Sequence, residues 1–359
     1  MKAGIKRIYT RLMHWEYWNS AIIYFPLFPY LFYLMIKART PFFFSAANPG
    51  IEYGGFTLES KWKMYQDAPE GFFPKTLCIS PDENTASVID RLYSAFQFPV
   101  VAKPDIGGKG KGVAILHNTD DLLAYHRSCP MPYLIQEKIN YPIEAGIFFV
   151  WFPGEAYGKI TGIVQKEFIK ITGNGTSTVL ELLTENPRYN LQLQQLQKII
   201  SPDLLYCKPL NNECVTVLEI GNHARGAAFR DVSFRATEAL THVIHNICAK
   251  FEGFYFGRLD IKFNSWEELE AGQKFGIIEL NGAGSEPTHI YDPSHSLVNA
   301  WKEIIRHWKL LQHIAAINHQ RGEAYLSWRD GKNLMKQHIA TEKKLHHFIY
   351  KPSQVHAVS

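Results

Sequence analysis

Two stretches late in the chain, Tyr255–Phe263 (YFGRLDIKF) and Phe275–Leu280 (FGIIEL) with the adjoining Asn281, carry the residues that decide how the chain is interpreted. Each is predicted as a strand, because short runs of apolar and aromatic residues are typical of buried strands. Alternate side chains of a strand face the same side of a sheet. The polar residues within each stretch are two positions apart, so each pair is expected to share one face.

The first pair is Arg258 and Asp260, and the second pair is Glu279 and Asn281. If the two strands lie side by side with these faces matched, three oxygen ligands and one guanidinium group converge. Carboxylate and amide oxygens suit Mg²⁺, and an arginine beside them can stabilise charge on a transferring phosphoryl group. A surface network of salt bridges is the alternative, and the apolar residues between the polar ones argue against it.

A glycine-rich loop lies between two further predicted strands, Phe98–Lys103 and Val113–Leu116. Its sequence GGKGKG, residues 107–112, is not a P-loop, because no Gly-Lys-Ser/Thr closes it. A strand follows it where the dinucleotide fingerprint needs a helix. Such a loop can still fold over phosphates through backbone N–H groups, with Lys109 and Lys111 neutralising charge. A mobile surface hairpin is the alternative.

The stretch Leu134–Glu144 (LIQEKINYPIE) is predicted as an apolar strand that ends in polar groups. A strand edge of this kind can bind adenine, and Glu144, seven residues beyond Glu137, could accept hydrogen bonds from ribose hydroxyls. An ordinary strand with a solvated end is the alternative, so this stretch alone decides little.

The composition excludes several classes of protein. With 46% hydrophobic and 20% charged residues over 359 positions, the chain is expected to fold into two or three lobes, and global disorder is excluded. A formal net charge of +4 is too small to indicate a nucleic-acid-binding protein. The five cysteines form no CxxC pair, which argues against a disulfide framework or a zinc finger and suits a reducing cytosol.

The N-terminal region contains an uncharged apolar run, Ala21–Ile36 (AIIYFPLFPYLFYLMI), in which Pro26 and Pro29 should interrupt a continuous helix. A membrane-spanning helix needs roughly 20 apolar residues, so the length is marginal. Both flanks are basic, so the positive-inside rule chooses no orientation. Contact with a membrane surface is one expectation, and a hydrophobic arm buried against the protein or in a homodimer is the other. The aromatic residues expected at headgroup depth are Trp15, Tyr17, Trp18, Tyr30 and Tyr33.

The order and spacing of these groups resemble the ATP-grasp superfamily over roughly residues 60–295. The chain is most similar to the D-alanine–D-alanine ligase type. The stretches TGNGTSTVLELL (172–183) and GNHARGAAFRD (221–231) are also similar to cyanophycin synthetase and to glutathione-synthesising relatives. The resemblance implies an α+β fold in which two lobes enclose ATP.

The same resemblance divides the chain into three parts. Residues 1–59 would form a hydrophobic arm in place of the usual Rossmann-like lobe. Residues 60–295 would form the catalytic domain, with a small lobe at about 85–140. Residues 296–359 would form C-terminal helices, on which the charges at 342–344 are expected to face solvent.

The resemblance also implies a role for each matched residue. Arg258 and Lys103 would be catalytic, with Arg258 holding an acyl phosphate. Two Mg²⁺ ions, or alternatively Mn²⁺, would be ligated by Asp260, Glu279 and Asn281. The residues expected to bind ATP are Lys61, Lys103, Gly107, Gly108, Lys109, Gly110, Gly112, Glu137, Lys138, Asn140 and Glu144. Contacts with the substrate are expected from Asn222, His223, Arg225 and Gly284.

The implied function is an ATP-dependent carboxylate–amine ligase that acts on small molecules and releases ADP and phosphate. A D-alanine–D-alanine or other dipeptide ligase is one alternative, although GAGS (282–285) replaces the Thr-Ser-Pro-Gly of that type. A non-catalytic nucleotide-binding module tethered to a membrane is another. The chain is expected in the cytoplasm, either free or on the inner face of the cytoplasmic membrane. The altered N-terminal region favours an amphiphilic or membrane-presented substrate.

Overall fold

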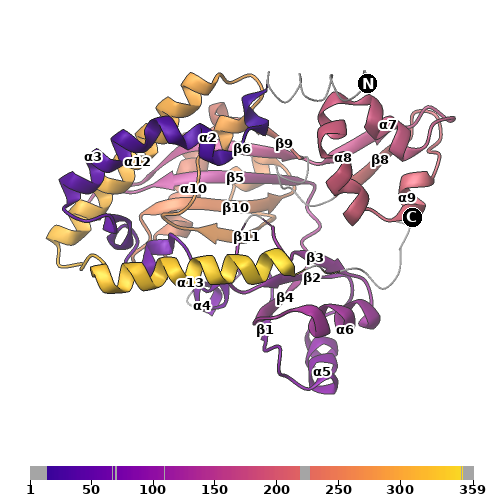
Figure 1. The fold of residues 1–359 in the computed structure, drawn as a ribbon, viewed down its shortest axis with the longest axis horizontal. Helices are drawn as coiled ribbons and strands as arrows, with labels where there is room; N and C mark the ends of the chain where they lie inside the picture. The colour runs from indigo at the N-terminus through magenta and orange to yellow at the C-terminus, as the bar shows by residue number, and fades with distance from the viewer. Residues whose placement is uncertain are drawn as a thin grey trace.

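The computed structural model describes residues 14–66, 68, 71–108, 110–218, 227–348 and 350. They form an α+β protein with three antiparallel sheets, which confirms the expected fold class. A small lobe and a large lobe are each built on one of the two bigger sheets, and a two-stranded unit lies at one end (Figure 1).

The small lobe contains a four-stranded antiparallel sheet in the order β1-β4-β2-β3. Its strands are β1 (Thr76–Ile79), β2 (Val100–Pro104), β3 (Ala114–Leu116) and β4 (Tyr133–Glu137). Helices α5 (Thr85–Ala95) and α6 (Thr119–Ser128) place Val88, Leu92 and Leu122 in one core with the sheet. Because β1 belongs to this sheet, the lobe begins at Thr76 and not at about residue 85 as expected.

The large lobe contains a five-stranded antiparallel sheet in the order β11-β10-β5-β6-β9. Its strands are β5 (Ile143–Val150), β6 (Lys159–Glu167), β9 (Ala228–Asp231), β10 (Phe256–Phe263) and β11 (Phe275–Asn281). Along β5, Ile147 and Phe149 pack in a different core from Phe148 and Val150, as the two-residue period of a strand requires. Both faces of this sheet are therefore buried.

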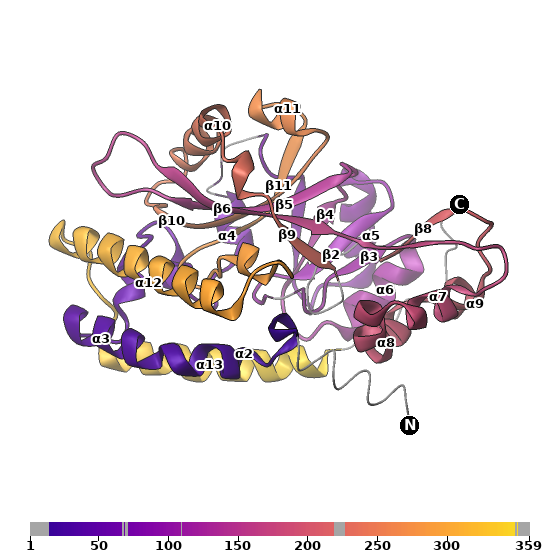
Figure 2. The same cartoon turned by 90° about the horizontal axis from the view of Figure 1, so that it is seen from above.

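Different helices cover the two faces of the large sheet (Figure 2). Helices α10 (Glu238–Cys248) and α11 (Trp266–Glu270) contribute Leu240, Ile244 and Leu269 to the core that includes Ile147. Helix α12 (Leu297–Gln320) contributes Leu311 and Ile314 to the opposite core. Short 3₁₀ helices, η6 (Ser233–Arg235) and η7 (Thr288–Tyr291), connect these elements.

A separate small unit contains the two-stranded sheet of β7 (Ile169–Thr172) and β8 (Cys214–Leu218). Its helices are α7 (Val179–Glu185), α8 (Pro187–Ile199) and α9 (Pro202–Tyr206). Helix α7 begins with a capping box, in which Thr178 and Glu181 satisfy each other's backbone N–H groups.

The N-terminal arm is an interrupted helix that lies outside α12. Its parts are η1 (Trp15–Tyr17), α2 (Ser20–Tyr24), η2 (Phe25–Leu27) and α3 (Phe28–Ala38). The expected interruption by the two prolines is present, since the chain tightens to a 3₁₀ turn at η2. Ile23, Leu27 and Leu34 are buried against the body, whereas the opposite side leaves Phe25 72% and Phe32 63% exposed.

Residues 20–38 form, within the described part of the chain, one helical stretch that is long and apolar enough to cross a membrane by length and composition alone. The arm is thus half packed on the protein and half unpartnered. The buried half agrees with the expectation of a hydrophobic arm.

The segment after the arm is part of the large lobe. It forms η3 (Phe43–Ala46) and η4 (Glu52–Gly55), followed by α4 (Lys61–Gln66). The buried Asn48 side chain donates to the backbone oxygens of Gly54 and Phe256, and its own oxygen accepts from two backbone N–H groups. One fully satisfied amide therefore fixes this segment to the start of β10.

The C-terminal helix α13 (Trp328–His347) runs from the large lobe to the small lobe (Figure 1). Leu334 is buried in the large-lobe core, whereas Phe348 packs against the small-lobe core. Glu342 forms an ion pair with Lys111 of the glycine loop at 2.6 Å. Lys343 and Lys344 are exposed, as expected for a solvated helix face, whereas Glu342 is only partly exposed because the glycine loop lies beside this turn.

Candidate functional site

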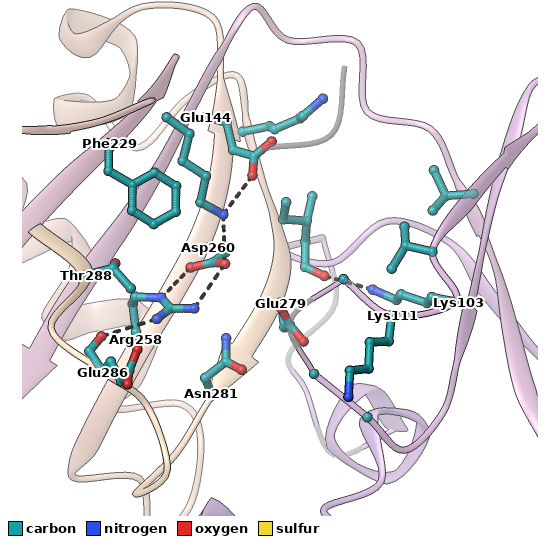
Figure 3. A pocket seen from close by; sticks show the side chains of 18 of the residues that line it. Lys103, Lys111, Glu144, Phe229, Arg258, Asp260, Glu279, Asn281, Glu286 and Thr288 are labelled. Atoms are coloured by element: carbon teal, nitrogen blue, oxygen red, sulfur yellow. Dashed lines mark hydrogen bonds and ion pairs between the residues drawn. The ribbon is translucent and has the colours of Figure 1, made fainter. Parts of the chain in front are cut away.

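A cavity of about 560 Å³ lies between the small and large sheets. Its walls come from β2, β3 and β4 on one side and from β6, β10 and β11 on the other, with the glycine loop and η1 at its margins. Figure 3 shows that charged side chains from both lobes point into it. The cavity thus collects polar groups from segments that are far apart in the sequence.

The central charges come from the paired strands β10 and β11. Arg258 lies opposite Asn281, and Asp260 lies opposite Glu279, with a register shift immediately after Asp260. All four side chains line the cavity. The matched-face arrangement that the two-residue spacing predicts is therefore the arrangement in the structure.

Asp260 is buried between two cations. The Arg258 Nε atom donates to Asp260 Oδ1 at 2.7 Å, and the Lys166 Nζ atom donates to Oδ2 at 3.0 Å. Burial alone would raise the pKa of Asp260, but Arg258 and Lys166 overcome that effect and lower it to about 2. The carboxylate is consequently ionised at every physiological pH.

Lys166 is the main functional residue that the sequence analysis missed. Its Nζ atom also donates to Glu144 at 2.8 Å, so one buried ammonium group bridges two buried carboxylates. Burial lowers the pKa of this lysine, but Asp260 and Glu144 outweigh burial and raise it above its ordinary value. The feature that could have predicted this ion pair is the β5–β6 hairpin, in which Glu144 lies opposite Lys166.

Glu144, expected to contact ribose, is instead buried in that ion pair. Glu144 still lines the cavity, so it belongs to the site as the ion-pair partner of Lys166. Its carboxylate holds Lys166 in place, because both groups are withdrawn from water.

Two further lysines face the cavity from the other side. Lys61 begins α4, is buried, and donates to the backbone oxygens of Asp105 and Gly107, while its Nζ atom lies 3.7 Å from Glu279. Lys103 of β2 donates to the Tyr65 hydroxyl and to a backbone oxygen of β11, each at 2.9 Å. Burial lowers the pKa of Lys103 to about 8, although Glu279 opposes that shift.

The glycine loop borders the cavity. Gly107, Gly108 and Gly110 line it, whereas Gly112 does not and instead lies under Pro104 and Phe348. Lys109 lies outside the described residues. The bond from Lys61 to the Gly107 oxygen joins the first lysine to this loop.

The expected adenine strip lines the cavity beside an apolar wall. Glu137, Lys138 and Ile139 follow the end of β4 and line the cavity, together with the apolar residues Val101, Val113 and Ile115. Asn140 is exposed and is not among the lining residues, so the structure does not bring it into the site. A flat apolar wall with polar groups at one edge can accommodate an aromatic base.

The oxygen donors fit a hard divalent cation. Glu279 is partly exposed to the cavity, and among the described residues the buried Nδ2 atom of Asn281 and the Oγ1 atom of Thr288 have no hydrogen-bond partner. Asn281 Nδ2 is a donor, so it can serve an oxygen atom of a bound ligand, while the amide oxygen of the same side chain is the atom that could face a cation. Within the described part of the chain, no group of three or more His, Cys, Asp or Glu side chains is placed to hold a metal. A cation here would therefore need the amide oxygen and phosphate oxygens as ligands.

The remaining expected substrate residues fall elsewhere. Asn222, His223 and Arg225 lie outside the described residues. Gly284 lines a second, adjacent cavity rather than the first. The arm contributes lining residues that were not expected, namely Glu16, Tyr17, Trp18 and Ser20.

Trp15 does not lie at headgroup depth as expected. It is buried, stacks on Tyr291 at a centroid distance of 5.7 Å, and donates through Nε1 to the His295 oxygen. The start of the arm therefore closes one margin of the cavity, because Trp15 packs against Tyr291 of the large lobe.

No protein-family model matches the chain, and no curated protein sequence is similar to it. Among solved structures, the bifunctional glutathione synthetase from Pasteurella multocida is similar at 16% identity and a TM-score of 0.37, over 69% of this chain and 35% of that one. The D-alanine–D-alanine ligase from Bacillus anthracis complexed with ATP is similar at 12% identity and a TM-score of 0.40, over 73% and 67%. The VanG D-Ala:D-Ser ligase from Enterococcus faecalis is similar at 11% identity and a TM-score of 0.39, over 69% and 61%.

This chain therefore spans about a third of the length of the glutathione synthetase.

Proposed function

We propose that this chain is an ATP-dependent ligase that joins a carboxylate to an amine and releases ADP and phosphate. The observation that carries the proposal is the convergence of Arg258, Asp260, Glu279 and Asn281 across the cavity from Lys61 and Lys103. Phosphoryl transfer mainly requires positioning and neutralisation of charge, and these residues supply both without a protein nucleophile.

The lysines and the loop would hold the triphosphate. Lys103 supplies positive charge from the small lobe and Lys61 from α4 of the large lobe, and backbone N–H groups of the glycine loop supply donors for phosphate oxygens. The apolar wall beside Glu137 would hold the adenine. A divalent cation held by the Glu279 carboxylate and the Asn281 amide oxygen would neutralise charge on the phosphates when bound, whereas Asp260 is already paired with Arg258 and Lys166.

Arg258 would bind the activated intermediate. A carboxylate oxygen attacks the terminal phosphorus, the bond to ADP breaks, and an acyl phosphate forms. The amine then attacks the acyl carbon, the C–O bond to phosphate breaks with its electron pair on phosphate, and one amine proton is released. Arg258 is held by Asp260 and by the Glu286 backbone oxygen, so its guanidinium group is already oriented for this charge.

The test is to incubate the protein with Mg·ATP, hydroxylamine and pools of carboxylates that include D-alanine, and to measure ADP and hydroxamate. Hydroxamate with stoichiometric ADP is the expected result. Release of AMP, or ATP binding without ADP release from any pool, would overturn the ligase and favour the non-catalytic module.

Paired carboxylate variants make this test specific. Glu279→Gln should abolish ADP release, because it removes a cavity carboxylate. Glu268→Gln is the matched control, since Glu268 lies in the same β10–β11 connection, pairs with Lys274 and does not line the cavity. Equal activity of the two variants would remove Glu279 from the mechanism.

We also propose that the outer side of the arm contacts an anionic membrane surface. Phe25, Phe28, Phe32 and Ile36 form this aromatic face, whose members are all half or more exposed. Figure 2 shows α13 alongside α2 and α3, and the α13 residues Lys332 and Lys336 are exposed. Apolar area plus basic charge is the combination that binds an anionic interface.

Vesicle sedimentation tests this contact. Binding to vesicles of phosphatidylglycerol and phosphatidylcholine should fall at least tenfold in Phe25→Ser/Phe32→Ser, whereas Phe234→Ser, at an 80% exposed position outside this face, should bind normally. If the double variant instead abolishes a dimer in light scattering and leaves vesicle binding unchanged, the face is an interface between copies.

A further inference from the structure

A second cavity of about 270 Å³ lies next to the first. Its walls are formed by α3, η3, α12 and the loop after β11, and they are mainly apolar. The lining includes aliphatic and aromatic residues such as Leu31, Met35, Phe43, Phe256 and Leu311. An apolar protein cavity of roughly 150 Å³ is already large enough to stay dry and bind benzene, so this one has room for a short hydrocarbon chain.

The two cavities meet at Glu286, which lines both. Tyr24 donates to Glu286 Oε1 at 2.6 Å and Tyr291 donates to Oε2 at 3.3 Å, while Arg258 donates to the Glu286 backbone oxygen at 3.2 Å. Burial, followed by the adjacent Glu286 carboxylate, holds the pKa of Tyr24 well above its ordinary value, so this hydroxyl remains a donor. The Glu286 carboxylate therefore lies between the second cavity and Arg258 of the proposed reaction site.

We propose that the second cavity binds the alkyl chain of an amine substrate whose ammonium group pairs with Glu286. Among the described residues that line this cavity, Glu286 is the one with a carboxylate, which attracts an ammonium group and repels a carboxylate head. The assignment rests on the proposed ligase function, because it supplies the amine for that reaction. It makes this chain a ligase for amphiphilic amines.

The chemistry balances with the groups present. The ammonium gives one proton to the Glu286 carboxylate, which frees the nitrogen lone pair for attack on the acyl carbon. The C–N bond forms, the C–O bond to phosphate breaks, and the remaining extra proton on nitrogen goes to the departing phosphate. Arg258 faces the acyl phosphate while its bond to the Glu286 backbone fixes the distance between the two substrates.

The experiment measures binding of n-alkylamines from butylamine to decylamine by calorimetry, with carboxylates of equal length as the comparison. Amine affinity should rise about fourfold per methylene, the fold-change that corresponds to about 0.8 kcal/mol per buried CH₂, and then level off when the cavity is full. Carboxylates should bind at least tenfold more weakly. No dependence on amine length would overturn the proposal, and a length dependence of carboxylates alone would overturn the assignment of the head group.

Two adjacent arm positions provide a matched pair of variants. Met35→Trp fills the cavity and should weaken octylamine binding at least tenfold, whereas Ile36→Trp lies on the exposed side and should leave it unchanged. Equal effects of the two would show binding outside the cavity. Because these measurements need no turnover, the wild-type length series remains decisive even if Met35→Trp does not fold.

Failure of the ligase proposal is separable from failure of this one. Length-dependent amine binding without ADP release would overturn the ligase and leave the apolar site. ADP-forming ligation of butylamine and decylamine with equal efficiency would leave the ligase and overturn the apolar site.

Discussion

Replacing Lys166 with methionine should strongly destabilise the protein. In the native chain, two carboxylates, Glu144 and Asp260, and two cations, Lys166 and Arg258, form a buried and neutral set. The variant leaves one net negative charge in that set. Removing one partner of a buried ion pair costs about 3–5 kcal/mol, because the remaining charge is desolvated and uncompensated.

The pH dependence of that loss follows from the same charges. Without the ammonium group, the buried set keeps one uncompensated negative charge, so the folded variant is stabilised when the set takes up one proton. The folded state then binds a proton more readily than the unfolded state, and the deficit in stability shrinks as pH falls. The slope reaches at most about 1.4 kcal/mol per pH unit for one group.

Urea unfolding of Lys166→Met at pH 5 and pH 8 measures both effects. The double variant Lys166→Met/Glu144→Gln should recover most of the stability, because it restores neutrality around Asp260. The adjacent control, Glu167→Gln, breaks a half-exposed pair with Arg230 and should cost under ~1 kcal/mol. A loss below 1 kcal/mol in Lys166→Met, equal at both pH values, would refute the reasoning.

Three further outcomes are expected. Burial lowers the pKa of Lys103 to about 8, and phosphates bind the charged form of this lysine, so ATP affinity should fall up to about tenfold per pH unit above pH 8. Calorimetry from pH 6 to 10 measures this affinity, and a flat profile would contradict the prediction. Burial lowers the pKa of His307 to about 4 in the folded protein, so the unfolded state, with a pKa near 6.5, takes up the proton first as pH falls. About 3 kcal/mol of stability should therefore be lost between pH 6.5 and pH 4. In urea unfolding, His307→Gln should show a smaller loss over the same pH range. Gly112→Ala should destabilise the protein by at least about 1–2 kcal/mol, because φ is +71° and the new Cβ would lie 2.7 Å from Pro104 and 2.8 Å from Phe348. An unchanged midpoint of thermal unfolding would contradict this packing.

The sequence predicted the centre of the site because the information there is local. Residues two apart on a strand share a face whatever the rest of the chain does, so Arg258, Asp260, Glu279 and Asn281 could be grouped before any fold was known. The boundaries of β10 and β11 and the capping box of α7 follow from equally local patterns.

The parts that could not be predicted depend on long-range contacts. Lys166 is a charged residue near the end of its strand, and only the pairing of β6 with β5, together with Asp260 on β10, withdraws it from water. Glu342 resembles any charged position on a helix surface, and its partner Lys111 is more than two hundred residues away. Trp15 has the amphipathic character of an interfacial residue, but it is buried and stacks on Tyr291 of the large lobe.

The attachment of α13 at both ends makes the opening of the cavity a property of the whole molecule. Leu334 anchors the helix in the large lobe, while Leu345 lies against Gly107 and Phe348 against the small-lobe core. A hinge rotation between the lobes must therefore bend the helix or detach one of its ends. Any partner that binds α13 more tightly in one position of the lobes is consequently linked to nucleotide affinity, and the factor is the same in both directions. If the partner is a bilayer, adsorption to the membrane and occupancy by nucleotide become two readouts of one equilibrium.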